Sequence, residues 1–150
     1  MRPYEKLHRH WRSDPGWTWK IRTADEAELA ALEERYGLKL PADFREYLQH
    51  SVLEPSDITN WPTEWWPIAS IKPISEECDR PVINPIVAAQ ADKYLVFADY
   101  AIWAMAWAIA CTGDAHVGRV MVINGSDDRF IASSFDAFVD RYIADVQAIL

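Results

Sequence analysis

The sequence has few cysteines, no excess of positive charge and no long apolar run. Its two cysteines, Cys78 and Cys111, lie far apart and outside any C-x-x-C pair, so we expect free, buried thiols and no disulfide scaffold. The net charge of −8 argues against a surface of clustered Lys and Arg, which bind phosphates by releasing counterions. Nucleic acids and anionic membranes are therefore not expected partners.

No segment approaches the roughly 20 apolar residues of a membrane helix. Residues 1–14, MRPYEKLHRHWRSD, lack the apolar stretch of a signal peptide. We therefore expect a cytoplasmic protein. Its acidity would attract a basic protein partner and speed their encounter, although acidity that only confers solubility explains the charge equally well.

The usual signatures of catalysis, cofactor binding and metal binding are also missing. His8 and His10 flank Arg9 without a cysteine or carboxylate cluster, so we expect solvated histidines and no metal site. Cys111 and His116 could form a nucleophile pair, but no predicted helix N-terminus or cationic cluster would lower the thiol pKa. No G-x-S-x-G, P-loop or G-x-G-x-x-G motif occurs. We expect no catalytic residue, no cofactor and no enzymatic activity.

What the chain does contain is enough apolar sequence for a core. Half of its 150 residues are apolar, which suffices for one domain without disulfides or metals. We expect a single domain over residues 1–150, with its main body at 23–150 and residues 1–22 as a packed N-terminal extension. A Pro15-Gly16 turn signal among three tryptophans predicts an irregular segment or a short hairpin through residue 20.

Two helices are predicted after this extension. Residues 23–26, TADE, have capping-box spacing with Thr23 as the cap. Apolar residues then recur at helical spacing as far as Tyr36, and Gly37 ends the helix. Pro41, placed at the first helical position, begins a second helix, which must lie against the first because the connection is short.

The next segment is predicted to contain short extended pieces. Six prolines between residues 54 and 85 exclude a long helix, and we expect a strand at 68–74 between loops at 60–67 and 76–85. The strand signals after this segment are three apolar runs, at residues 93–98, 101–110 and 118–123.

The run AIWAMAWAIA at 101–110 alternates with a period of two, which favours a strand over a helix. Trp103, Met105, Trp107 and Ile109 share one side, alanines share the other, and Ile102 is out of phase. We expect Trp103 and Trp107 in the core. The alanine side would allow another element to approach closely, or would be thinly covered.

The C-terminal helix has the clearest signal. Residues 133–136, SSFD, have capping-box spacing, and an apolar stripe continues to Ile149. The order of elements predicts an α+β fold: an N-terminal helix pair, a central, mainly antiparallel sheet, and a C-terminal amphipathic helix packed on the sheet.

Candidate binding residues come from the tryptophans and acids of the predicted loops. Trp61, Trp65 and Trp66 lie beside Glu64 in a proline-broken loop, and tryptophan is enriched among interface hot spots. These rings could equally plug the edge of the core beneath the loop. Two further acids, Asp127 and Asp128, follow an Asn124-Gly125 turn signal, where solvated carboxylates are expected.

Three segments together resemble the SUKH superfamily, also described as cell-wall-assembly-regulator and killer-toxin-resistance type domains. Residues 27–48 are similar to its helix–LP–helix signature, KYLVFADY at 93–100 to its central apolar strand, and residues 131–139 to the entry of its last helix. The chain departs from the pattern at 49–53, where many members have an Asn-Gly pair.

The resemblance implies a binding scaffold rather than an enzyme. Bacterial members commonly block polymorphic toxins, whereas fungal relatives act as regulators that recruit other proteins. We therefore expect an immunity protein that binds and occludes a cognate toxin, one with a basic surface. A regulatory scaffold or adaptor that binds endogenous proteins is the alternative. A small-ligand binder or enzyme would instead show a deep pocket with convergent polar groups.

Overall fold

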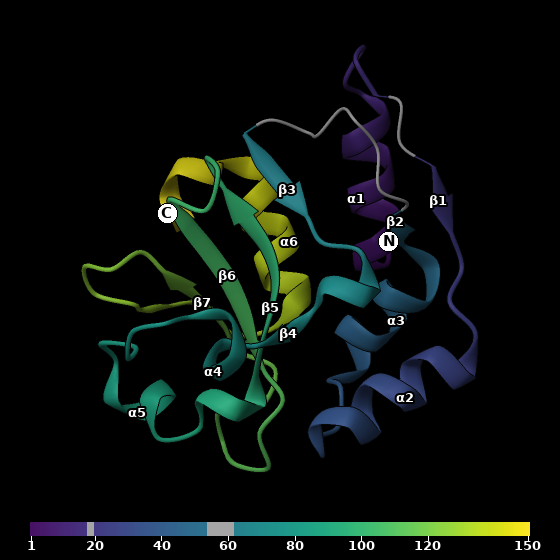
Figure 1. The fold of residues 1–150 in the computed structure, drawn as a ribbon. Helices are drawn as coiled ribbons and strands as arrows, with labels where there is room; N and C mark the ends of the chain where they lie inside the picture. Colours follow the sequence, from purple (N-terminus) through teal and green to yellow (C-terminus); the bar gives the residue numbers. More distant parts are fainter. Residues whose placement is uncertain (18–19, 54–61) are drawn as a thin grey trace.

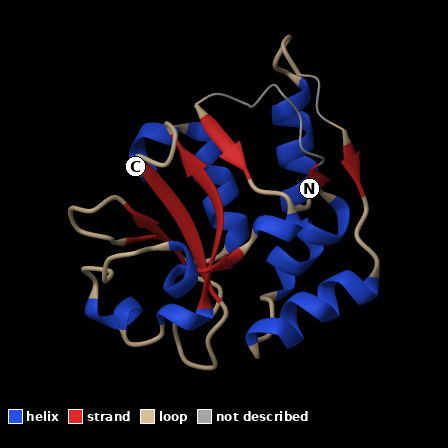
Figure 2. Ribbon diagram, in the orientation of Figure 1, coloured by secondary structure: helices blue, strands red, loops and turns tan. Residues whose placement is uncertain are grey.

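The computed structural model describes residues 1–17, 20–53 and 62–150, and in it an antiparallel sheet lies between two sets of helices (Figures 1 and 2). The α-helices are α1 (Pro3–Arg12), α2 (Glu26–Tyr36), α3 (Ala42–His50), α4 (Ile74–Glu77), α5 (Pro85–Ala88) and α6 (Phe135–Ala144). Short 3-10 turns occur at η1 (Ile68–Ser70), η2 (Ala91–Lys93) and η3 (Val146–Ile149). The predicted α+β class is confirmed.

The main sheet has six strands among the described residues. They are β3 (Thr63–Trp65), β4 (Lys72–Pro73), β5 (Tyr94–Tyr100), β6 (Met105–Ala110), β7 (Val120–Ile123) and β8 (Phe130–Ala132). The order is β3-β5-β6-β7-β8, with β4 also pairing with β5, and all these pairs are antiparallel. A separate two-stranded sheet pairs β1 (Ile21–Arg22) with β2 (Val52–Leu53).

The alternation predicted for the central run holds within β6. Trp107 and Ile109 enter the larger core beneath α1, α3 and α6, whereas Ala106, Ala108 and Ala110 face a smaller core. Because alanine is small, the backbone of another element can come close on that side. The strand begins only at Met105, since the preceding residues form the turn from β5.

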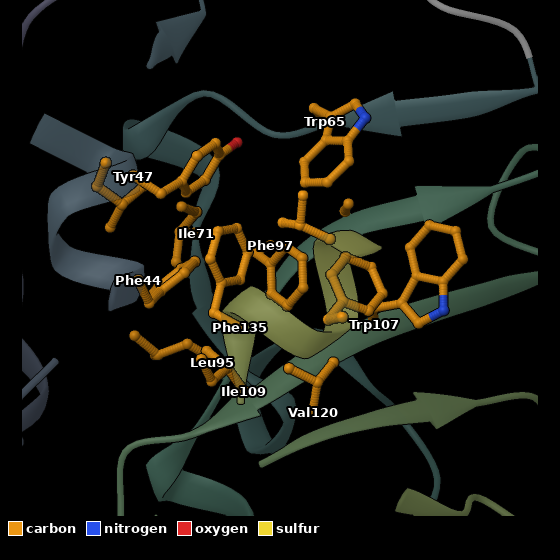
Figure 3. Packing of buried hydrophobic residues seen from close by; sticks show 14 of the residues in the cluster. Phe44, Tyr47, Trp65, Ile71, Leu95, Phe97, Trp107, Ile109, Val120 and Phe135 are labelled. Carbon is orange, nitrogen blue, oxygen red and sulfur yellow. The ribbon is translucent and has the colours of Figure 1, made fainter. Parts of the chain in front are cut away.

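Aromatic rings fill the larger core (Figure 3). Phe44 and Tyr47 of α3 contact Phe135 of α6, with ring centroids 5.2 and 4.8 Å apart. Phe97 of β5 lies 5.3 Å from Phe138. Aromatic pairs favour edge-to-face over face-to-face packing. Because these contacts link α3 and α6 to each other and to β5, both helices and the sheet share one core.

The smaller core covers the alanine face. Ile74 of α4 and Val87 of α5 are buried there against β5 and β6. Helices α4 and α5 therefore make the close approach to the alanine face that was predicted. Glu77, the last residue of α4, accepts a hydrogen bond from Trp103 in the β5–β6 connection.

The N-terminal segment forms helix α1, so the predicted irregular structure or hairpin is wrong. Pro3 occupies the first turn, and Glu5 accepts a hydrogen bond from the Arg2 amide at 3.0 Å. Leu7 and Trp11, one turn apart, are buried. The helical spacing of these two residues outweighs the later Pro-Gly turn signal, which takes effect only after the helix has ended.

Both predicted helix caps are displaced along the chain. Asp25, not Thr23, caps α2 by accepting from the Glu28 amide at 2.8 Å. Ser134, not Ser133, caps α6 by accepting from the Ala137 amide at 3.0 Å. In each case a second short polar side chain follows the predicted one, and the register that buries the apolar stripe selects between them.

The proline-broken segment differs most from its prediction. The expected strand at 68–74 is divided into η1, β4 and the start of α4, the expected loop at 60–67 contains β3, and the expected loop at 76–85 begins inside α4. Strand β8 was not predicted, because three residues between a turn and a helix cap are too few to show alternation. Pro41 lies at the N-cap of α3, one position before its predicted place.

His8 and His10 are half-buried, so the expectation of solvated histidines is wrong. His8 Nε2 lies 2.7 Å from Ser51 Oγ, and its ring contacts Tyr4 and Trp11. Burial, helped by the charge of Arg12, lowers the pKa of His8 to about 4. The folded protein therefore holds a neutral imidazole that an unfolded chain would protonate near pH 6.5.

This difference predicts acid sensitivity. Between about pH 6.5 and 4 the unfolded chain binds a proton at His8 that the folded protein does not, so the free energy of unfolding should fall as pH decreases. We expect the melting temperature to fall between pH 7 and pH 5, and to fall less in His8→Gln. Calorimetry at both pH values measures this, and equal decreases in the two proteins would contradict it.

Candidate functional site

The connection between β5 and β6 is a short left-handed turn. Ala101, Ile102 and Trp103 have φ angles of 53°, 54° and 61°. Each L-residue in this conformation costs about 1–2 kcal/mol, and a run of them is uncommon. Ile102, whose branched side chain suits the conformation least, is 84% exposed. The turn therefore displays an apolar side chain at a cost in stability.

Asp99 holds this turn in place. Its carboxylate is 5% exposed, and it accepts hydrogen bonds from the Trp103 backbone amide at 3.1 Å and from Trp66 Nε1 at 2.7 Å. The Ala101 amide donates to the Pro62 carbonyl at 2.8 Å. These bonds fasten the turn to the chain on both sides of β3, and charge-assisted bonds of this kind are strong.

A second carboxylate lies directly across from Asp99. Glu64 of β3 is its cross-strand partner, and like charges in this position destabilise a sheet. Burial, together with the charge of Asp99, raises the pKa of Glu64. A cation brought from outside would remove this repulsion.

Two surface hollows flank the turn. One, of about 500 Å³, is lined by Glu64, Trp66 and Glu77 among others, and the second, of about 450 Å³, by Glu77, Arg80 and Trp103 among others. Glu77 belongs to both. Its carboxylate accepts from Trp103 Nε1 at 2.9 Å and pairs with Lys72 at 2.9 Å.

The two hollows and the turn make one surface, which we call the tip face. It is defined by Glu64, Trp66, Glu77, Ile102 and Trp103. Acids exceed bases by one in each hollow, because Arg35 and Lys72 also line the first and Arg80 the second.

The residues of the predicted tryptophan loop differ in their exposure to solvent. Glu64 is exposed and Trp66 half-buried, both on the tip face. Trp65 is 3% exposed and packs against Trp11 and Tyr142 at 5.4 and 5.2 Å, which is the core-plugging alternative. Its place on β3 turns it inward because neighbouring strand residues point to opposite faces. Trp61 lies outside the described residues.

The two acids predicted to be solvated in the β7–β8 turn, Asp127 and Asp128, also differ in exposure. Asp128 is 2% exposed, and its carboxylate accepts from the amides of Asn124, Gly125 and Ile83. It is therefore not a solvated acid, because the fold uses its carboxylate to accept from three backbone amides. Asp127 is exposed, and the same turn places Gly125 against Arg80 of the second hollow. Asp127 itself pairs with Arg129 at 3.2 Å and lines neither hollow, so the structure does not bring it together with Glu64.

Sequence reasoning missed Asp99, Glu77 and Ile102 as site residues. It placed Trp103 in the core on the same side as Trp107, but Trp103 is half-buried and packs against the smaller core on the other face of the sheet. The departure of Ile102 from the alternation of its run was the signal that could have located the turn. The contribution of Glu77 needed the fold, because α4 and the turn are distant in sequence.

The two cysteines are the remaining side chains that the sequence raised as candidates for chemistry. Cys78 and Cys111 are free thiols, as predicted, but only Cys111 is buried, whereas Cys78 is half-buried. Burial strongly raises the pKa of Cys111, which keeps it protonated. Within the described ranges no group of three or more His, Cys, Asp or Glu side chains could hold a metal ion. In the same part of the chain, no helix is long and apolar enough to cross a membrane.

The strain at Ile102 predicts a stabilising substitution. Asn tolerates the left-handed conformation better than a branched residue, and the exposed Ile102 side chain buries little area. We expect Ile102→Asn to raise the free energy of unfolding by about 1 kcal/mol. Denaturant titration measures this against Ile83→Asn, an exposed isoleucine without a positive φ. An equal change in both variants would show that the turn stores no strain.

The comparisons with known proteins agree with this architecture. The profile of the SMI1/KNR4 family (SUKH-1) matches residues 23–141, a span that covers the helix pair, the sheet and most of α6. A search of the curated proteins finds no match. The resemblance predicted from the helix–LP–helix segment and the two later segments is confirmed, and the chain belongs to the SMI1/KNR4 family, SUKH-1.

Proposed function

We propose that this protein is a non-enzymatic immunity protein, which neutralises a basic toxin by binding it through the tip face and occluding its working surface. The observation that carries the proposal is the left-handed turn that holds Ile102 exposed beside two hollows, each lined by one more acid than base. Membership of SUKH-1 supports it, because bacterial members of this superfamily commonly block toxins.

The backbone strain supports a binding role. Residues in costly conformations persist where the surrounding structure over-determines them, and such positions cluster at functional sites. Asp99 supplies that constraint here. The exposed Ile102 offers apolar area that serves no purpose in the folded monomer, but would be buried in a complex.

The flanking indoles support the same conclusion. Trp66 and Trp103 each donate their ring N–H to a carboxylate, Asp99 and Glu77 respectively. Their orientations are therefore set before a partner arrives, which reduces the conformational entropy lost on binding. Fixed aromatic rings beside an apolar tip are typical of interface hot spots.

Charge supports a basic partner. The chain carries a net charge of −8, and the Glu64–Asp99 repulsion would be relieved by a Lys or Arg side chain from the partner. Complementary fields raise the association rate and exclude partners of like charge. A toxin that acts on nucleic acid has a basic working surface for its substrate, and it would present such side chains.

Survival of a bacterial host tests the proposal. We expect this protein to restore growth when co-expressed with a lethal product of the adjacent gene, and Ile102→Asp to abolish that rescue. Val117→Asp is the matched control, because Val117 is also exposed but follows the opposite end of β6. Growth no better than with an empty vector would rule the immunity role out.

Association kinetics test the charged part of the face. We expect Glu64→Lys with Glu76→Lys, two exposed acids of the first hollow, to slow association with that toxin about tenfold at low ionic strength, and less as salt increases. Asp127 is left intact because it pairs with Arg129. Asp128 is left intact because it supports its turn. The control Asp92→Lys with Glu34→Lys changes net charge equally at exposed sites outside the tip face. An equal slowing by this pair would show that only net charge matters.

A further inference from the structure

The edge of the sheet opposite β3 has a groove lined by basic side chains. Strand β8 pairs only with β7 among the described strands. A groove of about 320 Å³ follows it and is lined by residues 129–133, together with Arg119, Arg141 and Ala148. Three arginines line this groove and no acidic residue does, although acids outnumber bases 23 to 15 in the chain.

Two of the three arginines lack an acidic partner. Arg129 pairs with Asp127 at 3.2 Å and donates to the Leu150 carbonyl at 2.9 Å. Arg119 lies over the Phe130 ring at 5.9 Å. Among the described residues, neither Arg119 nor Arg141 makes an ion pair, and both are exposed. An anion bound in this groove would therefore meet two guanidinium groups that no described carboxylate neutralises.

We propose that this arginine groove is a second binding site, and that its occupant is a short acidic segment of a protein partner laid beside β8. The guanidinium group presents a planar fork of donors that matches a carboxylate. An exposed strand edge offers backbone groups to an added strand, as in other complexes formed by β-augmentation. The half-buried Phe130 supplies apolar contact within the same groove.

The net negative charge of the protein outside the groove limits the length of the ligand that can bind there. A long polyanion such as a nucleic acid would extend beyond the groove over a surface of net negative charge, where repulsion acts across a Debye length of about 10 Å at 0.1 M salt. A segment of a few residues stays within the basic groove. The groove covers the whole of β8, which fits an extended peptide better than a compact ion.

This site is independent of the tip face. The two lie on opposite edges of the sheet, at β8 and β3, and they select opposite charges. Failure of the proposed toxin binding would therefore leave the arginine groove intact as a proposal.

The experiment uses the full chain and a fluorescently labelled hexapeptide, Glu-Val-Glu-Val-Glu-Val, in which carboxylates share one side of a strand. We expect saturable anisotropy binding that weakens with salt. Binding of the Lys-Val counterpart, which the net charge of −8 would attract to other surfaces, should not weaken in Arg119→Gln or Arg141→Gln. Arg119→Gln and Arg141→Gln should each weaken binding of the Glu-Val peptide about fivefold, the effect of one ion pair near the upper end of the surface range. Arg9→Gln, an exposed arginine on α1, should leave it unchanged.

Two further measurements separate peptide docking from other causes. Amide shifts on titration should concentrate in residues 129–133, and a peptide N-methylated at alternate residues should bind several-fold more weakly. Equal weakening by Arg9→Gln would show binding to diffuse charge and overturn the proposal. Unchanged affinity of the methylated peptide, with displacement by millimolar inorganic phosphate, would also overturn it by showing a simple anion site.

Discussion

The two unequal faces of β6 are the constraint on which the rest of the structure depends. Trp107 and Ile109 on one face require a thick aromatic core, which α1, α3 and α6 supply. Alanines on the other face allow α4 to lie close against the sheet. That close approach brings Glu77 within hydrogen-bonding distance of Trp103. The packing of the core thus decides which side chains meet at the tip face.

The left-handed turn shows how a stable sheet can carry a costly surface feature. Charge-assisted hydrogen bonds to Asp99 hold the turn, and this carboxylate is itself buried against β3. Removing a charge from water is expensive unless its hydrogen bonds are satisfied. The repulsion from Glu64 remains uncompensated within the described residues. Three penalties therefore occur at one place: backbone strain, the exposure of Ile102 and the Glu64–Asp99 repulsion. Binding of a cationic partner would bury Ile102 and relieve the repulsion.

Much of the fold could be predicted from the sequence, and less of the site. Periodicity located α2, α3, α6 and the three long strands because each buries one side of a regular element. It could not place β8 or the caps of α2 and α6, where two polar residues compete for one position. Trp65 and Trp66 looked alike in the sequence, yet strand alternation sends one inward and leaves the other on the tip face. Asp99 and Glu77 gain their roles only from contacts between distant segments.

The opposite charges of the two sheet edges bear on how a partner is oriented. The β3 edge carries Glu64 and lies beside Glu77, whereas the β8 edge lies beside arginines at positions 119, 129 and 141. Such a separation gives the molecule a charge asymmetry along the sheet, in addition to its net charge of −8. In the proposed binding mode, a uniformly basic partner would approach the tip face and be repelled from the arginine groove. A partner with one basic and one acidic region would be aligned along the sheet before contact, because long-range fields act on approach rather than on the docked state.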